Sequence, residues 1–393
     1  MEIAIAVFDL AKAGGIERDA ARVGRALAAR GHNVRLISTS SSPLADGIPL
    51  TKLRARGLTN HGRMTSFSRD LEAIVDRRKS IVVGFQRLTG LDVLYCGDWR
   101  VPTGFLAGLM PRYRALRRLE EACCGPDSHT ALLMLSQAQA DAYRKAWSID
   151  IGRITVLPPT LDPRRLIPSP TEQERLGLRR SFDIKDHQCA WLWIGLQPKV
   201  KGLERVIAAL AMSRNARLLI AGVDPGDKRL GRLLERAGLE GYLDRITTLG
   251  MVDHDMLDRL FGACDVLVHP ARLDVTGTVI VEALGANVPV VTTENCGYAV
   301  HVKSSGAGSV LPEHASPAAI AKAAAAAVES RASLTRLAHS YVAASQLTGG
   351  IQLAVAKIEE IANLASSKSR IAPQSPSARR VVVPSDGGLA VEQ

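Results

Sequence analysis

A proline-rich segment, residues 156–170, separates two long stretches in which short apolar segments alternate with helical ones. Its five prolines exclude a central strand or a helix interior, because proline lacks a backbone N–H and clashes with the preceding helical turn. On both sides, strand–helix–strand units require a parallel sheet covered by helices. We therefore predict an α/β fold of two doubly wound, Rossmann-like domains that face each other across a cleft, with ligands at the carboxyl ends of the strands.

The predicted strands are 2–8, 33–37, 80–83, 93–95, 130–136, 189–194, 217–221, 245–249, 265–269 and 288–292. The predicted helices are 17–30, 137–147, 202–213, 228–237, 254–263, 279–284 and 317–329. The domains are expected at 1–165 and 166–345, followed by a helix at 346–365 that returns to the first domain. Residues 366–393 are rich in Ser, Pro and Arg, which predicts a disordered tail.

Composition excludes some classes of protein. A net charge of +11 favours an acidic partner, such as nucleic acid, an anionic membrane face or a phosphorylated ligand, but only 4% aromatic residues argues against stacked-base recognition. The six cysteines form no C-x-x-C pair, which predicts reduced thiols in a cytosolic protein, with Cys123 and Cys124 as a buried pair rather than a lipidation or metal site. No apolar run reaches about 18 residues and the first residues lack a basic region, so neither a transmembrane helix nor a signal peptide is predicted.

Two corners are suited to phosphate groups. Gly14 and Gly15 follow the first strand and open a helix, where backbone N–H groups can approach an anion closely. In the second domain, Lys199 and Lys201 precede a helix that begins near Gly202, which suits a diphosphate. The alternatives are a plain tight turn and two solvated loop lysines.

Two carboxylates lie eight positions apart in the segment 274–299. Asp274 follows a strand, and Glu282 lies in the first turns of a helix that Thr276 or Thr278 is expected to cap. Ionised carboxylates only accept hydrogen bonds, so they match the vicinal hydroxyls of ribose and hexose. The alternatives are a turn acid at Asp274 and, at Glu282, an acid that the helix dipole stabilises.

With these residues in view, the chain resembles the retaining glycosyltransferases of family 4, which have the GT-B fold and an acid-x7-Glu motif. It is similar in particular to members that glucosylate the heptose region of the lipopolysaccharide inner core. The matching segments reach to about residue 365 and include 14–38, 60–63, 82–98, 157–159, 201–210, 267–271, 276–284 and 288–302. Domain 1–165 would then be the acceptor side and domain 166–345 the nucleotide-sugar side.

The resemblance implies roles on the second domain. Glu282 would hold the ribose hydroxyls and Asp274 the donor hexose at its 3- or 4-hydroxyl. Lys201, helped by Lys199, would neutralise the diphosphate. The sugar pocket would also be lined by the backbone of Gly297 and Tyr298.

On the first domain, the resemblance implies that Gly14 and Gly15 meet the diphosphate or sugar. Asp98 would face the transferred hexose, and Asp19 would orient the acceptor. Asp98, Asp274 and Lys201 are the catalytic candidates. The implied donor is UDP-glucose, used as a substrate with retention and with no cofactor. No D-x-D pair or His/Asp cluster at ligand spacing is present, and His269 and His301 are read as structural, so no metal is expected.

Two residues depart from the family pattern. Asp274 stands where the family usually has Glu. Aspartate is one methylene shorter, so its carboxylate lies roughly 1.5 Å, one C–C bond length, closer to the backbone. Leu196 stands where the family often has Arg directly after the strand-end glycine. Lys199 is the expected substitute, although the lysine ammonium group is a point charge and lacks the planar, two-pronged geometry of a guanidinium.

A basic segment at 104–124 combines apolar residues with Arg112, Arg114, Arg117 and Arg118. Such a helix can lie on an anionic bilayer, which predicts peripheral attachment to the cytoplasmic face of the inner membrane, where a lipopolysaccharide acceptor is anchored. The alternative is a solvated helix over the cleft.

Three other functions remain open at this point. One is a related transferase acting on another polysaccharide or lipid-linked acceptor. Another is a non-catalytic protein that binds nucleotide sugars or phosphoglycans. A nucleic-acid binder agrees with the charge alone, because no basic motif is concentrated on one element.

Overall fold

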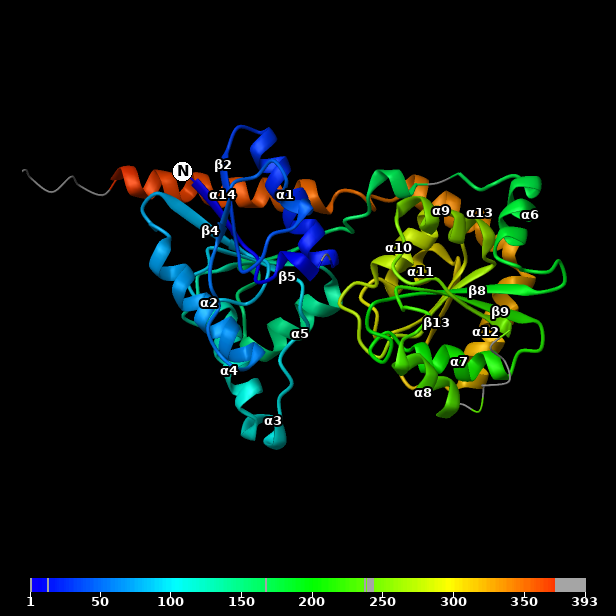
Figure 1. Ribbon diagram of the computed structural model, residues 1–393. Coiled ribbons are helices and arrows are strands. Elements are labelled where there is room, and N and C mark those ends of the chain that lie inside the picture. The colour runs from blue at the N-terminus through cyan, green and yellow to red at the C-terminus, as the bar shows by residue number, and fades with distance from the viewer. Residues whose placement is uncertain (1, 13, 167, 237, 239–243, 372–393) are drawn as a thin grey trace, which may run out of the picture.

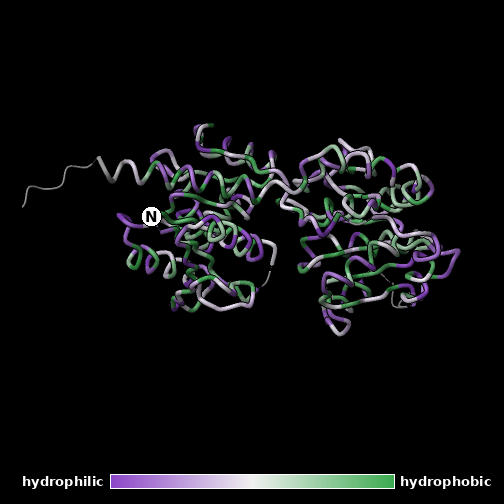
Figure 2. The backbone as a smooth tube through the Cα atoms, turned by 90° about the horizontal axis from the view of Figure 1, so that it is seen from above, coloured by the Kyte–Doolittle hydropathy of each residue, from purple (hydrophilic) through white to green (hydrophobic). Residues whose placement is uncertain are grey.

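The computed structural model describes residues 2–12, 14–166, 168–236, 238 and 244–371. Two lobes lie side by side (Figures 1 and 2). Each is built around one parallel sheet with helices on both faces (Figure 1). The predicted α/β fold of two Rossmann-like units is confirmed.

The first lobe contains a sheet of order β3-β2-β1-β4-β5-β6-β7, with every strand parallel to its neighbours. Its strands are β1 (Glu2–Ala6), β2 (Asn33–Ser38), β3 (Leu50–Lys52), β4 (Ser80–Gly84), β5 (Val93–Cys96), β6 (Ala131–Met134) and β7 (Ile154–Val156). Its helices are η1 (Leu10–Lys12), α1 (Gly15–Ala29), η2 (Pro43–Ala45), α2 (Asn60–Ile74), α3 (Phe105–Leu109), α4 (Pro111–Cys124), α5 (Gln137–Trp147) and η3 (Ile151–Arg153).

The second lobe contains a sheet of order β10-β9-β8-β11-β12-β13. Its strands are β8 (Cys189–Ile194), β9 (Ala216–Ala221), β10 (Ile246–Thr248), β11 (Val266–His269), β12 (Val290–Thr293) and β13 (Gly308–Leu311). Its helices, with the linker turn, are η4 (Pro163–Arg165), α6 (Glu172–Ser181), α7 (Leu203–Ala211), α8 (Lys228–Arg236), α9 (His254–Ala263), α10 (Thr278–Gly285), α11 (Ala299–Ser305), α12 (Pro317–Glu329) and α13 (Arg331–Ala344).

Central strands in both sheets are buried on both faces. Residues 3–6 of β1 are fully buried, as are residues 190–193 of β8, which explains why these strands are continuously apolar in sequence. On α1 only one face is apolar: Ala20, Val23 and Leu27 pack into the core beside the sheet. The strand order places β1 and β5 on either side of β4 in the first sheet, and β8 beside β11 in the second.

The chain passes between the lobes twice. The proline-rich linker runs from the first lobe to the second, and helix α14 (Gly350–Ile371) returns along α1, as Figure 1 shows. The two passages are bonded together, because Leu161 donates to the Leu347 carbonyl at 3.0 Å and Gly350 donates to the Pro159 carbonyl at 3.1 Å. Ile351, Val355 and Ile358 belong to the core of the first lobe.

Several predictions need correction. The tail was predicted to begin at 366, but α14 continues to Ile371, because no glycine or proline interrupts the sequence before Pro373; the rest of the predicted tail, 372–393, lies outside the described residues. Helices α2, α6, α11 and α13 were not predicted, nor were β3, β7 and β13. The helix predicted at 17–30 begins two residues earlier, at Gly15.

Candidate active site

A hollow of about 420 Å³ opens between the lobes at the carboxyl ends of β5, β8 and β11. The first lobe contributes Gly14, Gly15, Asp19, Asp98 and neighbouring residues, and the second contributes Gly195, Lys201, His269, Asp274, Thr276 and Thr278 among others. Six of the predicted site residues therefore line one cleft, although they come from positions 14 to 274 of the chain.

Asp274 lies at the centre of a buried ionic cluster. Its Oδ2 is 2.6 Å from Lys201 Nζ and 3.0 Å from His269 Nε2. The Asp274 side chain is 9% exposed and that of His269 is 1% exposed, whereas Lys201 keeps 25% of its side chain exposed toward the hollow. The lysine is therefore the member of the cluster that a ligand reaches most directly.

The cluster keeps the Asp274 carboxylate ionised. Burial alone would raise the pKa of Asp274, but the hydrogen bond from His269 and the charge of Lys201 outweigh it and hold that pKa well below its usual range. For His269, burial favours the neutral ring, yet the bond to Asp274 raises its pKa to about 9. At neutral pH the cluster thus holds one carboxylate between two cations. Sequence reasoning treated His269 as structural and missed this contact; its position at the end of a buried strand, five residues before Asp274, was the available signal.

Local backbone bonds fix the loop that carries Asp274. Asp274 N–H donates to the Asn295 carbonyl at 3.1 Å, and Gly297 N–H donates to the Asp274 carbonyl at 3.0 Å. Tyr298 N–H donates to the Thr276 carbonyl at 2.7 Å, and a Cβ at Gly297 would collide with the Val275 carbonyl. The N–H groups of Gly297 and Tyr298 hold the Asp274 loop, and neither residue lines the hollow, so their contact with the sugar stays a prediction.

The start of α10 also differs from the prediction. Gly277 is the N-cap, with φ of 75°, and no side chain caps the helix. Thr276 and Thr278 instead lie 3.3 Å apart, hydroxyl to hydroxyl. The left-handed conformation, which glycine adopts most easily, makes Gly277 the turning point and leaves both threonines facing the cleft.

Glu282, on the second turn of α10, lies in an adjoining hollow of about 220 Å³ that also contains Gly15, Asp19 and Thr278. Among the described residues its carboxyl has no hydrogen-bond or ion-pair partner. Burial raises the pKa of Glu282, and the nearby guanidinium groups of Arg165 and Arg18 oppose that effect. Other arginines that line this hollow are Arg22, Arg25 and Arg164. Glu282 is therefore a carboxyl group available to a ligand.

The two acids of the first lobe differ in surroundings. Asp98 follows β5 and keeps 50% of its side chain exposed. Asp19, on α1, accepts bonds from Tyr95 Oη at 2.8 Å and Thr160 Oγ1 at 3.1 Å, and burial raises its pKa despite these bonds. Both acids line the hollow, and Asp98 is the more exposed of the two.

Lys199 is not part of the central hollow. It lines a separate depression with Gln197, Glu204, Arg232 and Arg272. Leu196 does line the central hollow, where the family often has Arg, and its side chain is 49% exposed. The structure therefore places Lys201 but not Lys199 in the central hollow, because the bond from Lys201 N–H to the Gln197 carbonyl turns the loop there, and the substitution of Lys199 for that arginine stays a prediction.

The basic segment forms two helices, α3 and α4. Phe105 and Leu106 are 83% and 76% exposed, and Leu109 and Met110 are exposed beside them. Arg112, Arg114, Arg117 and Arg118 are exposed on α4, whereas Leu119, Glu120, Cys123 and Cys124 are buried on its other face. No helix within the described ranges is both long and apolar enough to traverse a bilayer.

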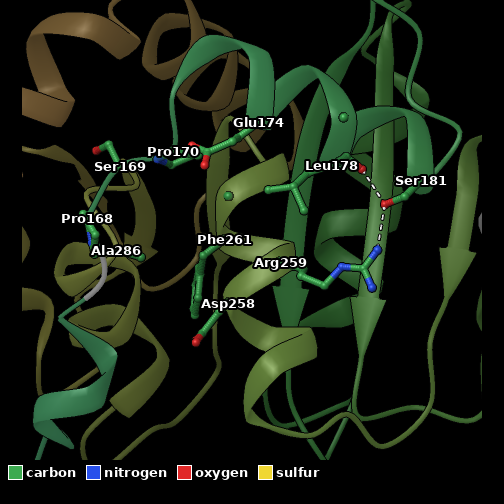
Figure 3. A pocket seen from close by; sticks show the side chains of 12 residues that line it. Pro168, Ser169, Pro170, Glu174, Leu178, Ser181, Asp258, Arg259, Phe261 and Ala286 are labelled. Atoms are coloured by element: carbon green, nitrogen blue, oxygen red, sulfur yellow. Dashed lines mark hydrogen bonds between the residues drawn. The ribbon is translucent and has the colours of Figure 1, made fainter.

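A further depression, drawn in Figure 3, lies between the linker and helices α6 and α9. Pro168, Leu178 and Phe261 give it an apolar wall, and Arg259 reaches toward Ser181. None of the predicted site residues lines it. The described residues also contain no group of three or more His, Cys, Asp or Glu side chains that could hold a metal ion.

Two Rossmann-like lobes with a lysine–carboxylate cluster at the strand ends of the second define the GT-B class of architecture. The crystal structure of WaaG, a glycosyltransferase involved in lipopolysaccharide biosynthesis, superposes with a TM-score of 0.80, at 27% identity over 90% of this chain and 98% of that one. A complex of Anabaena Alr3699/HepE with UDP and glucose shares the fold, with a TM-score of 0.70 at 18% identity, and covers 93% of this chain and 100% of its own.

Sequence comparison gives the family. Residues 178–343 match the family described as glycosyl transferases group 1. The chain is 30% identical over 326 residues to lipopolysaccharide glucosyltransferase WaaG of Escherichia coli (strain K12), covering 80% of this chain and 86% of that protein. It is 27% identical over 191 residues to alpha-D-kanosaminyltransferase of Streptomyces kanamyceticus, 48% of each chain. The chain belongs to the group 1 glycosyl transferases and is a glycosyltransferase.

Proposed function

We propose that the protein transfers glucose from UDP-glucose to the heptose region of the lipopolysaccharide inner core, with retention at the sugar carbon. The similarity to a lipopolysaccharide glucosyltransferase over 80% of the chain supports the acceptor class. The observation that carries the chemistry is the cluster of Lys201, Asp274 and His269, which faces the acids of the first lobe across one hollow.

Each residue of the cleft has a proposed task. Lys201 leaves Asp274 and moves to the donor diphosphate, because a diphosphate presents more negative charge than one carboxylate. Asp274, still held by His269, then accepts hydrogen bonds from hexose hydroxyls. Glu282 accepts bonds from the ribose hydroxyls, and Asp98 faces the hexose from the first lobe. Asp19 orients the acceptor, with Gly14 and Gly15 close to the diphosphate or sugar.

The proposed reaction needs no cofactor and no metal. The bond between the sugar carbon and the phosphate oxygen breaks as the acceptor oxygen attacks from the same face. The leaving phosphate takes the acceptor proton. Developing negative charge is then stabilised by Lys201 and by backbone N–H groups at helix starts, the role that a metal plays in other enzymes.

We also propose that α3 and α4 attach the protein to the anionic cytoplasmic face of the inner membrane. Four exposed apolar side chains adjoin four exposed arginines there, a combination that favours the boundary between headgroups and acyl chains. The protein would then bind a lipid-anchored acceptor at the membrane surface.

Transfer with a panel of UDP- and GDP-sugars, comparing wild type with Glu282→Ala, tests the function. We expect wild type to use UDP-glucose with a lipopolysaccharide core acceptor, and the variant to lose donor affinity. Transfer to a different polysaccharide or lipid-linked acceptor would favour the related transferase. Nucleotide binding without turnover in either protein would favour a binding module.

A further inference from the structure

The loop that carries Asp98, residues 97–101, is held by side chains that the reaction above does not use. Gln139 Nε2 donates to the Asp98 carbonyl at 2.8 Å, and Tyr143 Oη donates to the same carbonyl at 3.3 Å. Both side chains come from α5 and are fully buried. The backbone of the loop is therefore fixed from beneath, while the Asp98 carboxylate stays open to the cleft.

A buried ion pair lies next to this loop. Arg87 Nη1 is 2.6 Å from Glu120 Oε2 and 3.0 Å from the Trp99 carbonyl, and its Nη2 is 3.4 Å from Asp98 Oδ2. Glu120 Oε2 also accepts the Val101 N–H at 2.7 Å. Arg87 and Glu120 thus contact the loop at 98, 99 and 101, and Arg87 also reaches the carboxylate itself.

Stability alone is a poor reason for such a pair. Arg87 and Glu120 have side chains 9% and 2% exposed, so both lose most of their hydration. Replacing a buried ion pair by apolar residues of similar volume is often neutral or stabilising. A charged pair does offer fixed directions of hydrogen bonding, which apolar packing cannot, and here those directions point at the Asp98 loop.

We propose that Arg87 and Glu120 are positioning residues for Asp98, which fix the loop 97–101 and the rotamer of the Asp98 carboxylate toward the cleft. This inference rests on the proposed role of Asp98. A small misplacement of a catalytic group is enough to cost about 10²-fold in rate.

The test compares Glu120→Gln, Arg87→Met and Arg87→Lys with wild type, each alone and combined with Asp98→Asn. We expect Glu120→Gln and Arg87→Met to lower kcat at least about 10-fold with donor KM within roughly twofold of wild type, and Arg87→Lys to keep part of the rate. In the Asp98→Asn background, Arg87→Met is expected to change kcat less than twofold. Arg87 acts on the rate by positioning the Asp98 carboxylate, and that variant no longer has this carboxylate.

Arg153→Met is the matched control. Arg153 donates to the carbonyls of Cys123 and Gly125 at the C-terminal end of α4 and to that of Thr130 beyond it, and among the described residues it has no hydrogen bond to the Asp98 loop. Its loss disturbs the same helix while leaving the loop contacts intact. A fall in kcat for Arg153→Met equal to that for Glu120→Gln would overturn the proposal, as would fully multiplicative effects of Arg87→Met and Asp98→Asn.

A readout independent of turnover separates this inference from the proposed function. Hydrogen exchange of the amides at 97–101 is expected to be at least about 10-fold faster in Glu120→Gln and Arg87→Met than in Arg153→Met. Equal exchange in all three would overturn the positioning role even if the enzyme transfers sugar. If wild type transfers no sugar from any donor, the proposed function fails, and the exchange rates alone decide whether the pair fixes the loop. If Arg87→Met does not fold, kcat and the amide exchange rates are both measured on the isosteric variant Glu120→Gln.

Discussion

Lys201 and Asp274 are bonded to each other, Nζ to Oδ2 at 2.6 Å, in the cleft where each was expected to bind a different part of a nucleotide sugar. Because the lysine is the more exposed partner and His269 supports the aspartate from beneath, the pair can separate without leaving a bare buried carboxylate. The bond is consistent with a resting arrangement that a diphosphate would rearrange.

Lys201→Met should weaken binding of the nucleotide sugar by about 1.5–3 kcal/mol, or roughly 10- to 150-fold in Kd, the contribution of a charged hydrogen bond. Calorimetric titration with UDP-glucose measures this. Lys199→Met is the control, because Lys199 lines the neighbouring depression, and it should change Kd less than about threefold. Similar losses for both lysines would contradict the inward role of Lys201 alone.

Asp274→Ala should reduce turnover more than nucleotide affinity. The substitution removes the acceptor for hexose hydroxyls and frees Lys201 for the diphosphate, so kcat should fall by about 10²- to 10³-fold while the Kd for UDP changes little. Asp274→Glu should keep measurable transfer, and the donor panel reports whether sugar preference changes. Equal loss of kcat and UDP affinity in Asp274→Ala would mean that Asp274 shapes the loop and does not touch the sugar.

The protonation of His269 predicts a pH dependence of stability. Its pKa rises from 6.5 in the unfolded chain to about 9 in the folded protein, so folding binds a proton between these values. The resulting stability is fully present below pH 6.5 and is lost as pH rises toward 9, by at most about 3 kcal/mol. Urea unfolding of wild type and His269→Asn from pH 6 to 9.5 measures it. The difference between the two proteins should shrink with rising pH; parallel curves would show that His269 folds in the neutral form.

Attachment to membranes should depend on α4. The triple variant R114E/R117E/R118E should lose binding to vesicles that contain anionic lipid, since each basic residue near such a surface contributes about 1 kcal/mol. The control K303E/K322E/R336E makes the same change of charge on exposed positions of the second lobe. Sedimentation with anionic and neutral vesicles compares them. Unchanged binding of the first variant, or equal loss in both, would contradict attachment through α4.

Ile358→Ala should destabilise the first lobe. Ile358 lies on α14 and is fully buried in that core, so its truncation should lower the free energy of unfolding by about 2–5 kcal/mol without changing nucleotide affinity. Leu364→Ala, at a position 56% exposed on the same helix, should cost less than about 0.5 kcal/mol. Thermal unfolding of both variants decides whether α14 is an integral part of the lobe.

The sequence predicted the architecture well where periodicity and prolines act together. The buried strands beginning at Glu2 and Cys189 were found because they are continuously apolar. Helix α2 was missed because its buried positions include Ser66 and Ser68, which do not read as an apolar face. Contacts between distant segments, such as that of Lys201 with Asp274, follow from strand order and loop geometry, which no local pattern contains.

The same limit applies to the residues of the site. Gly297 resembled a ligand-binding glycine in sequence, but its N–H is taken by the carbonyl of Asp274, 23 positions away. The sequence predicted that Lys199 would help Lys201, but the bond from Lys201 N–H to the Gln197 carbonyl turns the chain, and of the two lysines only Lys201 lines the hollow. Such choices depend on the path of the backbone.

The two bonded passages between the lobes have a mechanical consequence. Separated connections would hold the lobes at two points and resist opening, whereas Leu161, bonded to Leu347, and Pro159, bonded to Gly350, bring both connections to one place. The two connections can then act as a single hinge about which the lobes rotate. Such a rotation would change the distance between Asp98 and Asp274 while leaving both sheets intact, which gives a nucleotide sugar a route of entry without local unfolding.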